Sequence, residues 1–257
     1  MPGRLQDRAA IVTGGAGGIG SATAALFGAE GARVAIVDLD PDALARAAGE
    51  IARLGGGDVR AIAADITRED EAFRAVDEAA GAFGGLDVLV NNAGVREYGL
   101  LAERPASSWE RIVAVNILGT ANCTRAALPH LRRADDGNIV NVSSTFGVIA
   151  RTGMGQYDAT KAAIVSMTRT VACEEAAHGV RANVVCPGGV LTTYHLERYA
   201  AQGIGRAELE EEQKAVPLMG RWAEPREIAC PILWLASAEA SFVTATTLMV
   251  DGGKSAL

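Results

Sequence analysis

The sequence has few cysteine and histidine residues, and none of them has the spacing of a metal site. Its four cysteines, Cys123, Cys173, Cys186 and Cys230, are scattered without a CxxC pair. Its three histidines are isolated, and none belongs to an HExxH motif. Metal sites and disulfide frameworks need such residues at close, defined spacing. We therefore expect reduced, buried cysteines and no structural or catalytic metal.

Long apolar runs and clusters of basic residues are also absent. No apolar stretch approaches the roughly 18 residues of a membrane-spanning helix. The start of the chain lacks a positive segment followed by an apolar run, so no secretory signal is visible. A net charge of −7 without any Lys/Arg run disfavours nucleic acid and anionic membranes as partners. These absences predict a cytoplasmic protein that acts on a small-molecule substrate.

Apolar and small residues are present in amounts typical of a globular α/β protein. The chain has 257 residues, of which 49% are hydrophobic and 30 are glycine. Short apolar runs alternate with helical patterns, which predicts right-handed crossovers and a parallel sheet with helices on both faces. We expect a Rossmann-type, doubly wound sheet of about seven strands in a single domain over residues 1–257. The predicted strands cover residues 9–12, 33–37, 59–64, 86–90, 138–142, 180–185 and 246–250, and a helix is predicted over 225–236.

Three of the predicted helices carry N-terminal signals. Asp40 precedes a proline, an order typical of an N-cap followed by the first helical residue. Thr67 is expected to cap the next helix. Ser107 and Glu110 have the spacing of a capping box, which would open a long helix that contains Asn116.

A glycine-rich turn follows the first predicted strand. It reads Thr13-Gly14-Gly15-Ala16-Gly17-Gly18-Ile19-Gly20 and leads into a helical pattern. Glycines let the backbone turn tightly and approach a phosphate, and a helix N-terminus offers free N–H groups and partial positive charge. Because the turn lies between a strand and a helix, we predict that it binds a dinucleotide.

The residues after the second predicted strand favour NAD over NADP. Asp38 lies 20 residues after Gly18, where a carboxylate can accept hydrogen bonds from both hydroxyls of the adenosine ribose. The same carboxylate would repel a 2′-phosphate. Leu39 follows instead of an arginine, and Gly17 stands where a basic side chain could have reached a phosphate. Since Asp40 is expected to cap a helix, Asp38 remains for the ribose.

Tyr157 and Lys161 are separated by four residues in a segment that is predicted to be helical. Apolar and small residues follow for two turns, without proline or glycine. Positions i and i+4 lie on one face of a helix, so the phenol and the ammonium point the same way. A nearby cation favours the phenolate and lowers the phenol pKa toward the working range. The pair therefore predicts a proton donor and acceptor.

Polar and glycine residues gather at the carboxyl ends of the predicted strands. In an open parallel sheet, ligands bind outside these ends. The shared location therefore predicts one site for the glycine turn, Asp38, Asp65, Asn92, Ser144 and Pro187-Gly188.

Taken in order, the motifs resemble those of the short-chain dehydrogenase/reductase family over essentially the whole chain. They are TGxxxGxG at Thr13–Gly20, NNAG at Asn91–Gly94, Asn116 in the long helix, Ser144 thirteen residues before Tyr157, YxxxK at Tyr157–Lys161, and Pro187-Gly188. The resemblance implies that Tyr157 is the acid/base, that Lys161 lowers its pKa and holds the nicotinamide ribose, and that Ser144 orients the substrate oxygen. It implies that Asn116 anchors a water linking Lys161 to solvent. Ser143 competes for the serine role, and Thr160, in place of serine or alanine, is expected not to matter.

The resemblance also implies an NAD site and an oligomer. Asp65 and Ile66 would contact adenine, Asn92 and Gly94 the adjoining ribose, and Val190 and Thr192 the nicotinamide amide. A homotetramer or homodimer is implied, because the family commonly assembles through two long helices and the C-terminal strand. The full set of implied cofactor residues is Gly14, Gly17, Gly18, Ile19, Gly20, Asp38, Leu39, Asp65, Ile66, Asn92, Gly94, Tyr157, Lys161, Val190 and Thr192.

The substrate is less well defined by the sequence. Residues 191–216 lack clean periodicity and lie where the family has its substrate lid. Arg96 and Arg151 are candidates to bind a carboxylate or sulfonate, with surface charges as the alternative. Met154 and Tyr194 are further candidate substrate residues.

Three functions are compatible with these observations. The first is an NAD-dependent dehydrogenase acting on a secondary alcohol or a cyclic or aromatic diol. The second is a ketoreductase of the 3-oxoacyl type, which the absence of basic residues for a 2′-phosphate disfavours. The third is a non-catalytic NAD-binding sensor or scaffold, which would not need Ser144, Tyr157 and Lys161 together.

Overall fold

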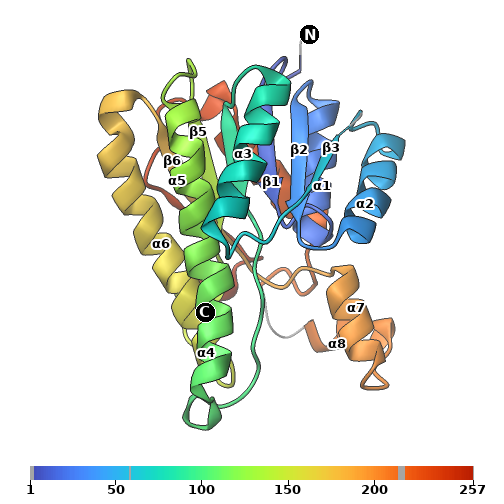
Figure 1. The fold of residues 1–257 in the computed structure, drawn as a ribbon. Coiled ribbons are helices and arrows are strands. Elements are labelled where there is room, and N and C mark those ends of the chain that lie inside the picture. Colours follow the sequence, from blue (N-terminus) through green and yellow to red (C-terminus); the bar gives the residue numbers. More distant parts are fainter. Residues whose placement is uncertain (1–2, 58, 214–217, 257) are drawn as a thin grey trace.

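A single seven-stranded parallel sheet forms the centre of the molecule (Figure 1). The computed structural model describes residues 3–57, 59–213 and 218–256. The strand order is β3-β2-β1-β4-β5-β6-β7, which confirms the predicted Rossmann-type sheet. The strands are β1 (Ala9–Thr13), β2 (Arg33–Asp38), β3 (Arg60–Ala63), β4 (Val88–Asn91), β5 (Asn138–Val142), β6 (Arg181–Pro187) and β7 (Thr247–Val250).

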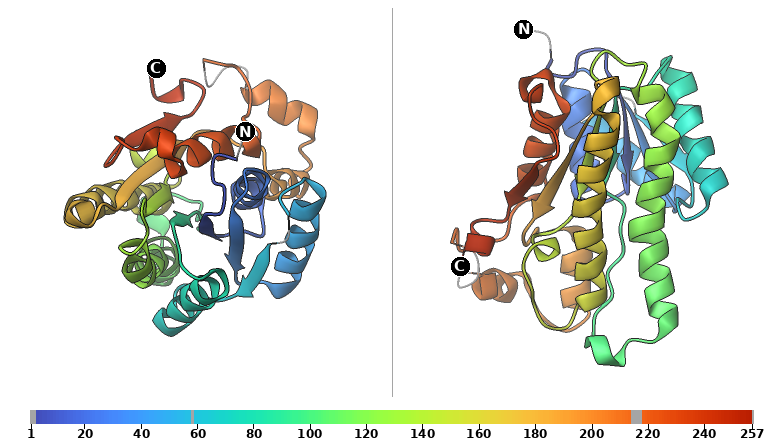
Figure 2. Two further views of the ribbon diagram at one scale, coloured as in Figure 1. Left: turned by 90° about the horizontal axis from the view of Figure 1, so that it is seen from above. Right: turned by 90° about the vertical axis from the view of Figure 1, so that its left-hand side faces the viewer.

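Helices cover both faces of the sheet, as Figure 2 shows from above. One layer contains α1 (Gly18–Ala29), α2 (Pro41–Arg53) and α9 (Pro225–Ala236), and the other contains α3 (Glu69–Phe83), α5 (Thr120–Leu131) and α6 (Gly155–Glu175). The helix α4 (Ala106–Val113) lies in line with α5 beyond the ends of the strands (Figure 1). Two separate apolar clusters fill the spaces between the sheet and these layers. This arrangement explains why the strands read as nearly continuous apolar runs: both of their faces are buried.

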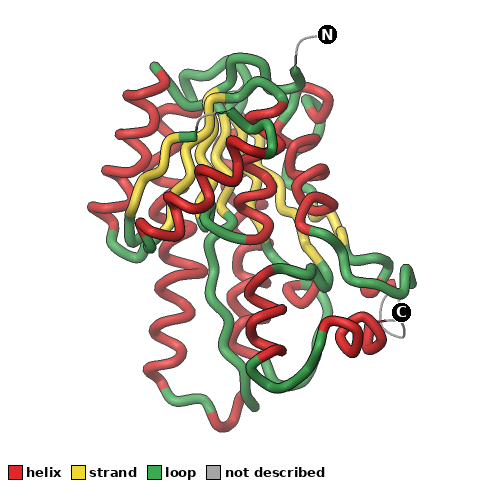
Figure 3. The backbone as a smooth tube through the Cα atoms, turned by 90° about the vertical axis from the view of Figure 1, so that its right-hand side faces the viewer, coloured by secondary structure: helices red, strands yellow, loops and turns green. Residues whose placement is uncertain are grey.

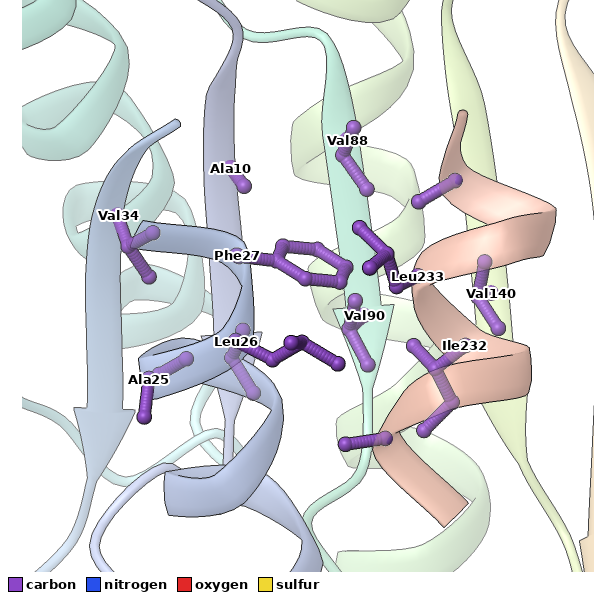
Figure 4. Close-up of a cluster of buried hydrophobic side chains, with 14 of the residues drawn as sticks. Ala10, Ala25, Leu26, Phe27, Val34, Val88, Val90, Val140, Ile232 and Leu233 are labelled. Atoms are coloured by element: carbon purple, nitrogen blue, oxygen red, sulfur yellow. The ribbon is translucent and has the colours of Figure 1, made fainter. Parts of the chain in front are cut away.

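Phe27 and Leu233 show how one of these layers packs. They project from α1 and α9 toward Val90 of β4, and all three side chains are almost inaccessible to solvent (Figure 4). Burying side chains of this size contributes about 1.5–3 kcal/mol each relative to leaving them exposed. The packing holds α1 against the sheet and therefore positions the glycine turn that precedes it.

The strand order reverses between β1 and β4, and this is where an open parallel sheet forms its ligand crevice. Beyond the carboxyl ends of the strands lie α7 (Thr193–Ala200) and α8 (Arg206–Gln213) (Figure 1). Figure 3 shows the loops that connect the strands to these outer helices. The expected lid thus consists of two short helices over most of its length, while residues 214–216 lie outside the described part of the chain.

The predicted helix starts agree with the structure at α2 but not at α3. Asp40 caps α2, and its carboxylate accepts hydrogen bonds from two backbone N–H groups. The prediction that Thr67 caps α3 is wrong, because α3 begins at Glu69 and Arg68 occupies the N-cap position. Thr67 instead donates to Asp65 Oδ1 at 2.7 Å. Asp65 therefore organises the turn before α3.

The predicted capping box of Ser107 and Glu110 is also wrong. The helix α4 begins at Ala106, directly after Pro105, and no side chain caps its N-terminus. Pro105 is the N-cap instead, and its carbonyl oxygen accepts the first helical hydrogen bond, from the backbone N–H of Ser108 at 3.1 Å. The box would require an N-cap at Ser107, two residues later than the observed N-cap, Pro105.

The long helix that contains Asn116 is not a continuous α-helix. Residues 114–119 form a π-helical turn, η2 (Ala114–Gly119), between α4 and α5. Such turns widen the backbone spacing and frequently occur at functional sites. Here the widened turn contains the asparagine that the sequence had singled out.

None of the helices in the described residues is long and apolar enough to cross a membrane. Within residues 3–57, 59–213 and 218–256, no group of three or more His, Cys, Asp or Glu side chains has an arrangement suited to a metal ion. All four cysteines are free thiols, two of them buried and two exposed. The exposure of Cys173 and Cys230 corrects the expectation that all four are buried, because each faces outward from its helix.

Candidate active site

A cleft of about 650 Å³ opens at the carboxyl ends of the strands. Most of the predicted site residues line it, which brings segments from the first to the last third of the chain together. They are Gly14, Gly17, Gly18, Ile19, Asp38, Leu39, Asp65, Ile66, Asn92, Gly94, Arg96, Ser144, Tyr157, Lys161, Pro187, Gly188, Val190, Thr192 and Tyr194. Gly20, Asn116, Arg151 and Met154 do not line the cleft.

The glycine turn is shaped by close approaches that exclude larger residues. Gly14 has φ +62°, and a Cβ there would lie 2.7 Å from the Cα of Ala93. A Cβ on Gly20 would lie 2.1 Å from the carbonyl oxygen of Gly14, so Gly20 acts through packing and not through contact with the cleft. These contacts hold the N-terminus of α1 close to β1 and β4.

The N-terminus of α1 is suited to bind a phosphate. No side chain caps it, and its first turn contains no acidic residue. A Cβ built on Gly17, at the N-cap, would meet no atom within 4 Å, so the turn is open on that side. Uncapped N–H groups at a helix N-terminus together with an open glycine turn fit the pyrophosphate of a dinucleotide.

Asp38 lies at the end of β2, beside the glycine turn. Its Oδ2 accepts a hydrogen bond from the backbone N–H of Ala16 at 3.1 Å, and its Oδ1 accepts from that of Leu39 at 2.8 Å. Each carboxylate oxygen has a further lone pair. The side chain is thus oriented toward the cleft and can still accept hydrogen bonds from a diol.

The end of β4 is tied to the glycine turn by Asn92. Its Nδ2 donates to the carbonyl oxygens of Thr13 and Gly14, both at 3.0 Å. On the opposite side of the cleft, Thr192 approaches Gly18 so closely that a Cβ on this glycine would lie 2.9 Å from Thr192 Cγ2. The cleft therefore narrows between the turn and the segment before α7.

Lys161 is almost completely buried and forms part of the floor of the cleft. Its Nζ donates to the carbonyl oxygen of Val142 at 2.9 Å, and the ammonium nitrogen lies 5.7 Å from the centre of the Tyr157 ring. Burial is the main cause that lowers the pKa of Lys161. The ammonium of Lys161 and the phenol of Tyr157 therefore lie close together in a buried part of the site, as their spacing of four residues on one helix predicted.

The pKa of Tyr157 is lower than that of an ordinary phenol. Burial by itself raises it, but the positive charges of Lys161 and Arg96 favour the phenolate and outweigh burial. Arg96 was not expected to contribute. Its guanidinium carbon lies 5.7 Å from the centre of the Tyr157 ring.

Ser143 and Ser144 differ in what their hydroxyl groups bind. Ser143 Oγ donates to the carbonyl oxygen of Lys161 at 2.7 Å, which commits its proton to the backbone. Ser144 Oγ accepts from the N–H of Phe146 at 3.2 Å. Its proton is therefore left for a ligand in the cleft, which favours Ser144 over Ser143 for the substrate oxygen.

Asn116 is fully buried and joins the π-helical turn to its surroundings. Its Oδ1 accepts from the N–H of Val95 at 2.8 Å, and its Nδ2 donates to the carbonyl oxygen of Val95 at 3.0 Å. The amide also donates to Thr160 Oγ1. The expectation that Thr160 does not matter stays a prediction, and this contact gives a reason to test it, since serine could replace the contact but alanine could not.

The structure separates the four candidate substrate residues. Arg96 and Tyr194 line the cleft. Arg151 forms an ion pair with Asp158 at 2.8 Å and lies over the ring of Phe146, so it is held outside the cleft. Met154 packs with Ile112 and the Tyr157 ring. Met154 therefore supports the phenol from behind instead of facing a substrate.

Several cleft residues were not singled out by the sequence. They are Val37, Ala64, Thr67, Ala93, Val95, Arg111, Val115, Val142 and Thr193. Most are apolar or common residues whose only signal is their place next to a predicted motif or strand end. The valines and alanines among them provide the apolar walls that cofactor clefts typically have.

Comparison with known proteins agrees with this geometry. A family model described as enoyl-(acyl carrier protein) reductase matches residues 14–255. The chain is 36% identical over its full length to 2-(S)-hydroxypropyl-CoM dehydrogenase 3 of Xanthobacter autotrophicus, which it also covers fully. It is 38% identical to cis-4-hydroxycyclohexanecarboxylate dehydrogenase of Sinomonas cyclohexanicum, with 98% of each protein covered.

Other similarities include a reductase and a solved structure. The chain is 35% identical to the 3-oxoacyl-(acyl-carrier-protein) reductase of Thermotoga maritima, over 97% of this chain and 98% of that protein. The ligand-free structure of aldohexose dehydrogenase from Thermoplasma acidophilum matches with a TM-score of 0.89 and 31% identity. That match covers 100% of this chain and 97% of the other.

Proposed function

Because the chain belongs to the short-chain dehydrogenase/reductase family of oxidoreductases, we propose that it is an NAD-dependent dehydrogenase of secondary alcohols or cyclic or aromatic diols. The observation that carries the proposal is the placement of Tyr157 and Lys161 in the same cleft as Asp38 and the glycine turn. A buried phenol with a lowered pKa has little use in a protein that only binds a cofactor.

Proton transfer at Tyr157 is the central step assigned to the protein. In the oxidative direction, the phenolate oxygen accepts the proton of the substrate hydroxyl, and Ser144 donates a hydrogen bond that orients the same oxygen. The bound dinucleotide would supply the hydride acceptor. Lys161 stabilises the phenolate by its charge. In the reductive direction, the Tyr157 hydroxyl returns the proton to the carbonyl oxygen.

Asn116 is proposed to connect Lys161 with solvent through a water. Its Oδ1 accepts one hydrogen bond, from Val95, and has a second lone pair for a water. Gly94 leaves the space between them open, because a Cβ there would approach Asn116 Oδ1 at 3.2 Å and Lys161 Nζ at 3.4 Å. Such a water would allow the proton taken up at Tyr157 to leave the buried corner.

Preference for NAD over NADP rests on Asp38. Its carboxylate faces the cleft and would accept hydrogen bonds from the adenosine ribose, whereas a 2′-phosphate would meet like charge. Leu39, which is largely exposed, offers no positive charge to such a phosphate. Asp65 and Ile66 are proposed to contact adenine, and Val190 and Thr192 the nicotinamide amide.

The first experiment is a titration of NAD(H) and NADP(H) against the wild type and the Asp38→Ala variant. We expect the wild type to bind NAD(H) more tightly and the variant to lose most of that preference. Oxidation of a panel of secondary alcohols and cyclic diols then tests the reaction. Preference of the wild type for NADP(H) would contradict the assignment of Asp38, and binding of neither cofactor would favour a scaffold.

A 3-oxoacyl reductase is the second candidate function. Similarity to the Thermotoga maritima 3-oxoacyl-(acyl-carrier-protein) reductase favours it. A wild-type protein that prefers NADPH and reduces 3-oxoacyl thioesters faster than it oxidises alcohols would support this reaction over the first.

The assembly is proposed to be a homotetramer or homodimer. Leu118, on the π-helical turn, and Phe242, close to β7, are exposed apolar side chains. Both lie in or near the segments through which the family commonly associates. The mass of the protein in solution, measured by light scattering, tests this proposal.

A further inference from the structure

Arg96 occupies the substrate end of the cleft. It follows Asn91–Gly94 by two residues, and its guanidinium carbon lies 5.7 Å from the centre of the Tyr157 ring and 5.5 Å from that of Tyr194. The side chain is partly buried and lines the cleft. A group bound to the guanidinium would therefore lie close to the atoms that react at Tyr157.

The position of Arg96 is set by a histidine of the lid. Arg96 Nη1 lies 2.5 Å from His195 Nε2, and His195 Nδ1 lies 3.0 Å from Thr192 Oγ1. Burial, together with the charges of Arg96 and Arg198, lowers the pKa of His195 to about 4, so the ring is neutral at neutral pH. Arginine can only donate, so Nε2 accepts and the ring proton is on Nδ1.

The charge of Arg96 is not neutralised by a carboxylate. None of the carboxylates in the described residues lies within 4 Å of it, and the same holds for Arg198, which stacks over the ring of Tyr98 at 3.8 Å. The neighbouring Glu97 pairs with Arg111 at 3.6 Å instead. Burial disfavours this cation, and the phenol groups of Tyr157 and Tyr98 are what offset burial, so a bound anion would supply the direct counter-ion that the carboxylates do not.

We propose that Arg96 binds an anionic group of the substrate, a carboxylate or a sulfonate, so that the substrate is a small hydroxy acid. The proposal rests on the proposed dehydrogenase function. Guanidinium groups match these anions with two parallel hydrogen bonds, and His195 leaves Arg96 further donors for this purpose. Because Arg96 lies beside Tyr157, the acid group and the hydroxyl-bearing carbon must be separated by only a few bonds.

Arg151, the other candidate, lies equally near the acid/base, with its guanidinium carbon 5.5 Å from the centre of the Tyr157 ring, but it differs from Arg96 in being paired. Its ion pair with Asp158 already neutralises its charge, and its guanidinium stacks on Phe146 with 3.7 Å to the ring centre. Recruiting Arg151 to a substrate would require breaking both contacts. The structure therefore distinguishes two arginines that the sequence treated alike.

The test compares an acid with its neutral amide. Cyclohexanecarboxylate and cyclohexanecarboxamide have nearly the same shape and cannot be oxidised at a hydroxyl, so calorimetric titration into the NADH complex measures binding alone. We expect the wild type to bind the acid about 10- to 100-fold more tightly than the amide, as a charge-assisted contact implies. The variant Arg96→Gln should lose this preference without weaker amide binding, and Arg96→Lys should retain part of it.

Arg111→Gln is the matched control. It removes one positive charge from the mouth of the same cleft, where Arg111 is exposed and paired with Glu97. We expect it to leave the acid preference nearly unchanged. Equal binding of acid and amide by the wild type would overturn the proposal. An equal loss of affinity for the acid and the amide in Arg96→Gln would also overturn it, since Arg96 would then act through Tyr157 and not on the anion.

The design keeps this proposal separate from the proposed function. The titrations are repeated without cofactor, so a protein that failed to bind NAD(H) would contradict the dehydrogenase assignment but still report on Arg96. When turnover is measured, cis-4-hydroxycyclohexanecarboxylate serves as the acidic substrate and its carboxamide as the neutral substrate. The preference for the acid should appear in KM and be lost in Arg96→Gln, whereas a change in kcat caused by the altered pKa of Tyr157 should be the same for acid and amide.

Discussion

The side-chain amide of Asn116 donates a hydrogen bond of 2.9 Å to Thr160 Oγ1, and Thr160 donates in turn to the carbonyl oxygen of Tyr157 at 2.8 Å. This chain joins the π-helical turn to the helix that carries the proposed acid/base. Thr160 is 1% exposed and Asn116 0%, so no water can easily replace either partner. Thr160 is therefore a positioning residue, although it does not face the cleft.

Replacing Thr160 tests this connection. Thr160→Val removes the hydroxyl and leaves a buried amide hydrogen of Asn116 without a partner, so we expect a stability loss of about 1–3 kcal/mol in urea unfolding. The rate of alcohol oxidation should fall as well. Thr160→Ser keeps the hydroxyl and should lose only about 0.8 kcal/mol with the methyl group. Equal losses in the two variants would mean that the hydrogen bond is unimportant.

Alcohol oxidation is expected to become faster as pH rises through the lowered pKa of Tyr157. The pKa is held down by Lys161 and Arg96 against the effect of burial, and only the phenolate can accept the substrate proton. Carbonyl reduction should become slower over the same pH range, because it needs the phenol. Rates measured from slightly acidic to alkaline pH check both directions.

Variants of Tyr157 and Lys161 identify the source of this pH dependence. Lys161→Met removes a positive charge, which should raise the pKa of Tyr157. The increase in the rate of alcohol oxidation should therefore occur at higher pH than in the wild type. Tyr157→Phe should reduce turnover by about 100- to 10,000-fold. NADH binding to Tyr157→Phe, measured by fluorescence, serves as the control for folding. A pH profile that is unchanged in Lys161→Met would exclude Lys161 as the tuning charge.

Cofactor preference should be reversible at the end of β2. Asp38→Ala combined with Leu39→Arg removes the carboxylate and adds a cation at a site where the side chain is 69% exposed. NADP(H) affinity is expected to increase on the order of 10- to 100-fold, as for other charge-assisted contacts. The control is Asp38→Ala with Leu39→Gln, which adds a long side chain without charge. If both double variants gain NADP(H) affinity equally, removal of the carboxylate alone is sufficient.

Two glycines of the turn should differ in their tolerance of alanine. Gly20→Ala places a Cβ 2.1 Å from the carbonyl oxygen of Gly14, so we expect a stability loss of about 1–3 kcal/mol from overpacking. Gly17→Ala meets no atom within 4 Å at a φ of −148°, which alanine readily adopts. Its stability should stay within about 1 kcal/mol of the wild type. Thermal and urea unfolding distinguish the two.

Much of the fold follows from local patterns in the sequence. The strand over residues 138–142 and the helix over 225–236 have their predicted bounds, because buried parallel strands and amphipathic helices produce distinct patterns over this length. The other strand ends agree with their predicted positions to within two residues. The prediction that Asp40 caps a helix is confirmed, because the proline that follows it makes the signal clear. The prediction that Ser107 caps the next long helix is wrong, because the helix begins earlier, directly after Pro105.

Within the site, spacing along the chain predicted that Tyr157 and Lys161 share a face, because four residues make about one helical turn. Spacing could not predict the π-helical turn at Asn116 or its bond to Thr160, since that contact joins positions 44 residues apart. Nor could it distinguish Arg96 from Arg151. Only the tertiary structure pairs Arg151 with Asp158 and brings His195 to Arg96, because both pairings depend on how loops and helices pack around the end of the sheet.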